Sequence, residues 1–142
     1  MAAGPTVKQI LQTYPGKIRL VIKNYPYKYR DFAKIAAEAS LAARDQNKYW
    51  EMHDILLTRS PKLDRASLIA YADELGLDLK KFTASIDNGG HANEIDRDVN
   101  LAQSMDLYNT PTFYINGRQV IGERPFDSFR KIIDEELHQT GR

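Results

Sequence analysis

The sequence predicts an α/β fold in which a strand, a long helical block and a terminal β-hairpin follow one another along 142 residues. Three observations lead to this prediction. Apolar residues alternate within Lys17–Pro26, which is typical of a strand. The middle of the chain repeats apolar residues at helical spacing. Near the end, Asn116-Gly117 joins two short apolar runs, and this dipeptide favours a two-residue hairpin turn.

Length and composition restrict the classes of function. The whole chain, 1–142, is predicted to be a single domain with a real core. The formal charge of +1, without a long basic stripe, argues against a nucleic-acid partner. No apolar run is long enough for membrane insertion. The chain contains no cysteine, so it has no disulfide, no thiolate and no cysteine metal ligand of its own.

The first elements are a helix and a strand. Val7, Ile10 and Leu11 have helical spacing within Pro5–Tyr14, and Pro15-Gly16 ends that helix. The strand follows, with its alternating side chains between Pro-Gly and Asn-Tyr-Pro. The chain therefore enters its helical middle from a strand.

Five helices are expected in that middle. The first is "DFAKIAAEASLAARDQ", and the second is "KYWEMHDILLTRS". Asp64 is predicted to be the N-cap of the third helix, which ends at Gly76. Asp78 is predicted to be the N-cap of the fourth helix. The fifth runs from about His91 to Met105. The first helix should bury one stripe, made of Phe32, Ile35, Ala36, Ala39 and Ala43.

The end of the chain is predicted as a hairpin followed by a helix. "TFYI" and "RQVIG" flank the Asn-Gly turn, and Pro125 suits the first turn of the helix. The buried stripe of that helix is predicted to be Phe126, Phe129, Ile133 and Leu137.

This order of elements, together with several stretches of sequence, resembles the thioredoxin-like domain of the DsbA family of thiol-disulfide oxidoreductases. The matching stretches are "PTVKQILQTYPGKIRLVIKNYP", "AAEASLAARDQNKYWEMHDILL", "LIAYADELGLDLKKF" and "NTPTFYINGRQVIGERPFDSFRKIIDEEL". The resemblance implies a thioredoxin-like fold with a helical insertion at about 30–105. It also implies that the first, central strand and the start of the first helix precede this chain.

The same resemblance implies a substrate loop at Asn109, Thr110 and Pro111. In such proteins the Thr-Pro bond is cis, and the residue before proline offers its backbone to an extended polypeptide. The residues alone leave an ordinary trans proline at a strand entrance open, since cis is a minority among X-Pro bonds. Asp106 and Asn109 replace glycines of many family members, so both are expected to adopt left-handed backbone.

The family's Cys-x-x-Cys motif is absent, and by the family's spacing its second cysteine would fall just before Met1. The expected consequence is a chain without catalytic residues, since thiol exchange needs a thiolate. Loss of the central strand would expose sheet edges at Ile18–Asn24 and Thr112–Ile115. We therefore expect direct closure of these strands, pairing with a second copy in a homodimer, or marginal stability.

Two function hypotheses follow. The first is the remainder of a DsbA-like oxidoreductase, whose intact parent works in the periplasm or elsewhere outside the cytoplasm. The second is a cysteine-free module that binds extended polypeptides; a glutathione-linked isomerase of the same superfamily is a weaker alternative. No cofactor and no metal are expected. His53 is interpreted as a polar helix-face residue, His91 as part of a helix boundary and His138 as a cation near a helix end.

The segment "NYPYKYRDF" is rich in tyrosine and positive charge. One interpretation is an exposed surface for a polypeptide partner, because tyrosine is favoured at interfaces. The other is a strand-to-helix connection whose tyrosines cover the edge of the core.

Overall fold

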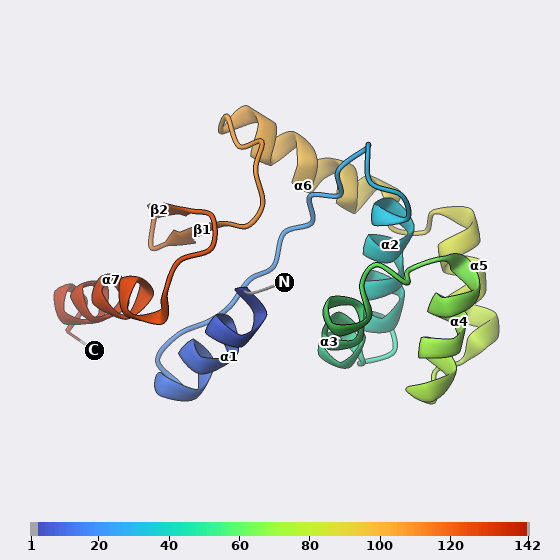
Figure 1. Cartoon of the computed structure of the whole chain (residues 1–142), viewed down its shortest axis with the longest axis horizontal. Helices are drawn as coiled ribbons and strands as arrows, with labels where there is room; N and C mark the ends of the chain where they lie inside the picture. Colours follow the sequence, from blue (N-terminus) through green and yellow to red (C-terminus); the bar gives the residue numbers. More distant parts are fainter. Residues whose placement is uncertain (1–2, 142) are drawn as a thin grey trace. The chain divides into compact units, whose positions relative to one another are not determined.

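The computed structural model describes residues 3–141, with seven helices and two strands in that range (Figure 1). The chain divides into two compact units. The terminal unit contains the chain up to Ile22 and from Asp106 onward, and the helical unit is Lys23–Met105. Each is described by itself.

The terminal unit contains α1 (Ala3–Thr13), β1 (Thr112–Ile115), β2 (Arg118–Ile121) and α7 (Phe126–Gln139). The two strands pair antiparallel, with Phe113 opposite Val120. Asn116 and Gly117 form the two-residue turn with φ angles of 49° and 86°, as the type I′ geometry requires. The predicted hairpin is therefore confirmed.

The core of the terminal unit is small. One face of the hairpin packs with α1 and α7, and the buried residues are Ile10, Tyr14, Val120, Phe129 and Ile133. The Tyr14 hydroxyl donates a hydrogen bond to Asp134 at 2.5 Å. Burial, then this hydrogen bond to a carboxylate, raises the pKa of Tyr14 to about 12. The buried phenol thus joins the end of α1 to α7.

The helical unit contains five helices, and α2 contacts each of the other four. They are α2 (Ala33–Arg44), α3 (Tyr49–Arg59), α4 (Arg65–Glu74), α5 (Leu79–Asn88) and α6 (Ala92–Ser104). The predicted caps are confirmed: Asp64 accepts from the backbone N–H of Ser67, and Asp78 from that of Lys81. Small alanines let α2 lie at the centre of the bundle.

The core of the helical unit is larger than that of the terminal unit. Its fully buried large side chains include Met52, Leu68 and Phe82, which belong to α3, α4 and α5. Ala39, Ala42 and Ala43 of α2 form the other side of this core. Among the helices of residues 3–141, none has both the length and the apolar character of a transmembrane segment.

The predicted strand at Lys17–Pro26 is wrong. The described residues form one sheet, which has two strands, and the segment has no regular secondary structure. Ile18 packs beside the terminal core, whereas Val21 is 58% exposed. An alternating pattern makes a strand only where a neighbour completes the ladder of hydrogen bonds. Direct closure onto Thr112–Ile115, one of the three outcomes expected for the exposed strand edges, is likewise not found in the described chain.

The prediction for Phe32 is also wrong. The remainder of the α2 stripe is inward, but Phe32 precedes the helix, with a φ of 65° and a side chain 48% exposed. Its carbonyl accepts the backbone N–H of Ala36. The left-handed backbone turns this residue away from the helical stripe to which its spacing assigned it.

Glu38 of α2 is a buried carboxylate at the start of α6. Its two oxygens lie 3.0 and 3.1 Å from the backbone N–H nitrogen of His91, the residue that caps α6. The ring of His91 lies 2.8 Å from Asp45, so the interpretation of His91 as a helix-boundary residue is confirmed. Burial raises the pKa of Glu38, and the hydrogen bond from His91 opposes this rise.

Replacing Glu38 with alanine is expected to lower the free energy of unfolding by about 1–3 kcal/mol, because the N–H of His91 loses its acceptor. Glu38→Gln keeps an acceptor and should cost less. Since the folded-state pKa lies above 4.5, folding binds a proton, and stability should fall as pH rises through that pKa. Urea titrations at a series of pH values measure both effects.

The glutamine variant should lack that fall, while Glu51→Gln on the exposed start of α3 should retain it. An unchanged pH dependence in Glu38→Gln would contradict the assignment.

Candidate polypeptide-binding site

The loop between α6 and β1 carries the three site residues expected from the sequence. Asn109 and Thr110 are exposed, and Pro111 is half-buried. The Thr110–Pro111 peptide bond is cis. The carbonyl of Asn109 accepts a hydrogen bond from the Thr112 hydroxyl at 2.7 Å. The structure therefore brings the three residues together on an accessible loop that leads directly into β1.

The expected left-handed backbone occurs at Asp106 but not at Asn109. Asp106 has a φ of 57°, whereas Asn109 is not among the described residues with positive φ. Asp106 is the second residue after α6, where helices commonly end in this conformation. The chain thus turns once, at the helix end, and Asn109 needs no special backbone.

The outer edge of the hairpin, on the side of β1 that does not face β2, carries backbone groups that are open for pairing. The N–H of Gly122 donates to the carbonyl of Pro111 at 2.8 Å, which continues the ladder beyond Thr112. Because bonded and non-bonded pairs alternate in antiparallel sheets, the backbone groups of Thr112 and Tyr114 point outward from β1. Within the described chain no backbone hydrogen bond satisfies them. This outer edge of β1 can accept another strand.

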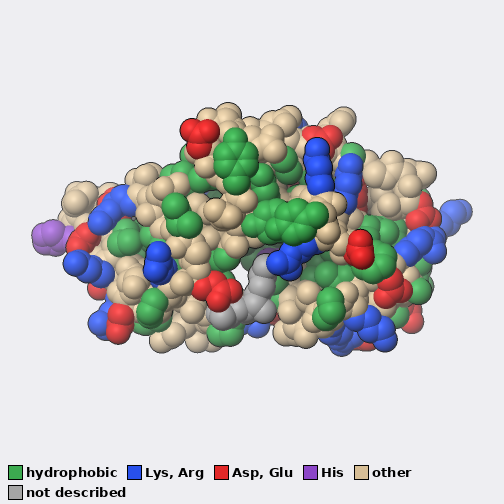
Figure 2. Space-filling view, turned by 45° about the horizontal axis from the view of Figure 1, so that its top comes forward, with side chains coloured by type: hydrophobic (Ala, Val, Ile, Leu, Met, Phe, Trp, Pro, Cys, Tyr) green, Lys and Arg blue, Asp and Glu red, His purple; other side chains and the backbone are tan. Residues whose placement is uncertain are grey.

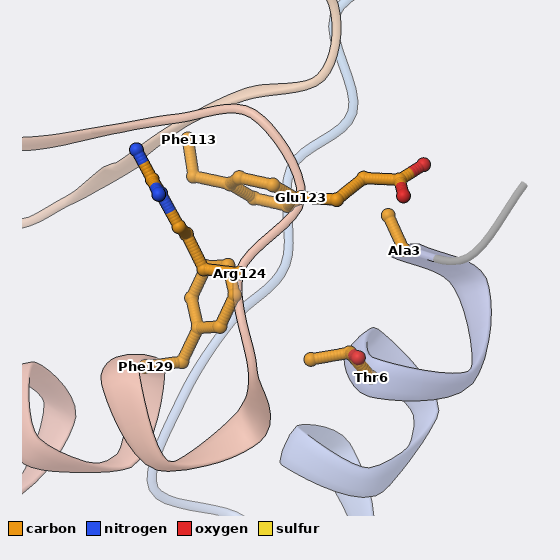
Figure 3. Close-up of a pocket in the computed structure, with 6 residues that line it drawn as sticks. All are labelled: Ala3, Thr6, Phe113, Glu123, Arg124 and Phe129. Carbon is orange, nitrogen blue, oxygen red and sulfur yellow. The ribbon is translucent and has the colours of Figure 1, made fainter.

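A pocket of about 210 Å³ lies in the same unit. Figure 3 shows its lining, which comes from α1, β1, the loop after β2, and α7: Ala3, Thr6, Phe113, Glu123, Arg124 and Phe129. The rings of Phe113 and Phe129 meet edge to face at 4.9 Å. This volume is below that of most ligand sites and suits one apolar side chain. Glu123 and Arg124 add one negative and one positive charge to the lining.

Sequence reasoning did not find Glu123 and Arg124. The signal was present in the hairpin itself, since a two-residue turn at Asn116-Gly117 places Gly122 opposite Pro111. The residues that follow Gly122 must therefore return to the level of the Thr110 loop. Arg124 is held there by a hydrogen bond from its Nε to the carbonyl of Ile121 at 3.2 Å.

Two kinds of reactive group, cysteine thiolates and metal ligands, can be checked directly. The chain contains no cysteine. Among the residues that the structure describes, no group of three histidine or acidic side chains is placed to hold a metal ion. His53 stacks on Tyr49 of its own helix, and His138 lies in the last turn of α7.

The family is given by a profile match. The family model described as "Thioredoxin" matches residues 2–135. The chain belongs to the thioredoxin family. The thioredoxin-like α/β fold with a helical insertion is thereby confirmed, as is the resemblance to DsbA-like thiol-disulfide oxidoreductases.

Solved thioredoxin-like structures share most of the chain's architecture. A thioredoxin-like oxidoreductase from Silicibacter pomeroyi is 26% identical, with a TM-score of 0.85, over 96% of this chain and 78% of that one. The thiol-disulfide exchange protein alpha-DsbA2 from Wolbachia pipientis is 21% identical, with a TM-score of 0.81, over 93% of this chain and 72% of that one. The second likeness shows the fold alone.

Curated relatives of this thioredoxin-family chain are much longer. A protein named Na(+)/H(+) antiporter NhaA 3, from Salinispora tropica, is 38% identical over 118 residues, which are 82% of this chain and 18% of the antiporter. The chain thus spans less than a fifth of the length of that relative.

Proposed function

We propose that the chain is the substrate-holding part of a DsbA-like thiol-disulfide oxidoreductase. An extended segment of polypeptide binds along Asn109–Pro111 and the outer edge of β1. The outward backbone groups of Thr112 and Tyr114 carry this proposal for the chain as given. The family's central strand, which would pair with this edge, is not among the described residues, so a guest strand can pair there. Pairing through the backbone accepts many sequences, which suits a protein that acts on varied polypeptides.

The pocket adds a preference to this general binding. A guest segment that passes β1 can place one side chain against the rings of Phe113 and Phe129. Fully burying an aliphatic or aromatic side chain contributes about 1.5–3 kcal/mol. We therefore propose that apolar residues of unfolded polypeptides are preferred there.

The exchange reaction itself needs groups that this chain lacks. A thiolate attacks one sulfur of a disulfide, a mixed disulfide forms, and the other sulfur leaves as a thiolate. With no cysteine, the chain as given is proposed to bind substrate without exchanging disulfides. We propose an extracytoplasmic compartment for the intact oxidoreductase, because protein disulfides persist there.

Tyr114→Pro tests the proposed binding. Proline removes the outward N–H at this position without removing a bond to β2, because Tyr114 and Gln119 form a non-bonded pair. The expected result is about tenfold weaker binding, equivalent to about 1.4 kcal/mol, of a fluorescein-labelled, reduced and alkylated unfolded polypeptide. Fluorescence anisotropy measures the affinity.

Gln119→Pro is the matched control. It removes the outward N–H on the opposite edge, and both variants lose the hydrogen bond between the Gln119 amide and the Tyr114 hydroxyl. Equal affinity of the two variants would contradict the proposal. A second copy of the chain is the other proposed occupant of the β1 edge, and sedimentation velocity would then show a dimer that Tyr114→Pro dissociates.

The curated relatives favour a second candidate function, a domain attached to a Na(+)/H(+) antiporter. An antibody raised against this chain tests it on native membranes. A membrane-bound species far heavier than 16.2 kDa supports an attached domain, and a species of that mass contradicts it.

A further inference from the structure

The helical unit begins with an ordered row of aromatic rings, which we name the aromatic segment, residues 23–34. The rings of Tyr25 and Tyr27 meet edge to face at 5.7 Å. Tyr27 and Tyr29 stack at 5.1 Å with their planes 15° apart. The guanidinium of Arg30 lies 5.8 Å from the centre of the Tyr27 ring. Successive contacts thus fix the rings against one another.

The base of the aromatic segment is fixed to α6. The backbone N–H of Asn24 donates to Asp98 at 2.9 Å, and the Lys23 ammonium lies 3.5 Å from the other oxygen of that carboxylate. Asp98 is only 8% exposed. Arg30 closes a turn by donating its N–H to the carbonyl of Tyr27. Rings held in this way lose little freedom when a partner binds.

Phe32 gives a second, independent observation. A bulky side chain rarely adopts a φ of 65°, because left-handed backbone costs roughly 1–2 kcal/mol for residues other than glycine. Burial does not repay this cost, since the ring is half exposed. Residues kept in costly backbone concentrate at binding sites. The backbone of Phe32 thus holds an aromatic ring in solvent three residues after Tyr29.

The charges of the aromatic segment are mostly positive. Its exposed cations are Lys23, Lys28, Arg30 and Lys34, and its acidic side chain is Asp31, also exposed. Tyr29 is 77% exposed among them. Figure 2 shows a face of the protein on which hydrophobic side chains and Lys or Arg side chains lie next to each other. A partner that covers this segment must bring negative charge and apolar or aromatic groups together.

We propose that the aromatic segment is a docking surface for an acidic, extended polypeptide segment. Tyrosine and arginine are the residues enriched where proteins bind one another. A membrane surface fits less well, because the tyrosines stack on one another instead of presenting their rings for insertion. The class of partner rests on the proposed function, but the aromatic segment belongs to the helical unit and the Thr110 loop to the terminal unit, so different variants test them.

The probe is a fluorescein-labelled peptide that alternates glutamate with leucine, titrated with the full chain. Arg30→Glu and Tyr29→Ser are each expected to weaken binding by about tenfold, and Tyr29→Phe to keep it within about twofold. Lys80→Glu is the matched control, an exposed charge reversal on α5 that should leave the affinity unchanged. Phe32→Gly should raise the melting temperature while it weakens binding by about fivefold.

Equal binding of a peptide that alternates lysine with leucine would overturn the proposal. An equal loss of affinity in Lys80→Glu would also overturn it. The same holds if the chain cosediments with vesicles containing anionic lipid but does not bind the acidic peptide. An extended acidic peptide can also pair with the β1 edge, so Arg30→Glu is expected to weaken its binding by about tenfold in the background of Tyr114→Pro as well. If Tyr114→Pro alone loses the acidic peptide, the β1 edge is the only docking surface and this inference fails while the proposed function stands. If Tyr114→Pro still binds both the unfolded polypeptide and the acidic peptide, and Arg30→Glu loses the acidic peptide, the proposed function fails and this inference stands.

Discussion

Phe129→Ala is expected to lower the free energy of unfolding by about 3–5 kcal/mol, because the ring fills the centre of the small terminal core. Phe129 is 3% exposed, and its ring meets that of Phe113 edge to face. Domains of this kind are stable by about 5–15 kcal/mol in total, so the loss is a large part of the whole. Urea unfolding followed by circular dichroism measures it.

The same substitution should weaken polypeptide binding, since Phe129 is also a wall of the pocket. Phe126→Ala provides the comparison, because Phe126 begins the same helix but is only partly buried. Its cost should be clearly smaller. A loss below about 1 kcal/mol in Phe129→Ala would show that the ring is dispensable to packing and would remove the pocket from the proposed site.

Local chemistry made the helices and the hairpin predictable. Asp64 and Asp78 are caps whose side chains accept backbone N–H groups within the next turn, so neighbours in sequence decide them. The turn at Asn116-Gly117 is equally local. Each of these predictions needed only residues a few positions apart, and the structure confirms them.

Predictions that depended on distant partners were less successful. The segment at Lys17–Pro26 has the pattern of a strand, but a strand exists only with a neighbour, and the described residues supply none. Phe32 has the spacing of the α2 stripe, but its backbone leaves the helix first. Spacing predicts which side chains could share a face and does not predict where a helix begins.

The candidate site also contains residues that local sequence predicts and residues whose place depends on distant pairing. A short stretch of sequence was enough to find Asn109, Thr110 and Pro111. Glu123 and Arg124 reach the site only through the register of the hairpin, so their place depends on pairing across the turn. The aromatic segment was visible as composition, but its ordered stacking and its attachment to Asp98 needed coordinates.

Phe82→Ala should cost about 3–5 kcal/mol in the helical unit, where the ring is fully buried among α2, α4 and α5. Hydrogen exchange measured by mass spectrometry should show faster exchange in peptides from these three helices. Phe82→Leu refills most of the volume and should cost less than the alanine variant.

Alanine is a better helix former than phenylalanine, so any loss in Phe82→Ala must come from packing and not from the helix itself. Lys80→Ala, an exposed position on the same helix, isolates that propensity effect and should be neutral or slightly stabilising. If Phe82→Ala also proved neutral, the bundle could not have the core described above.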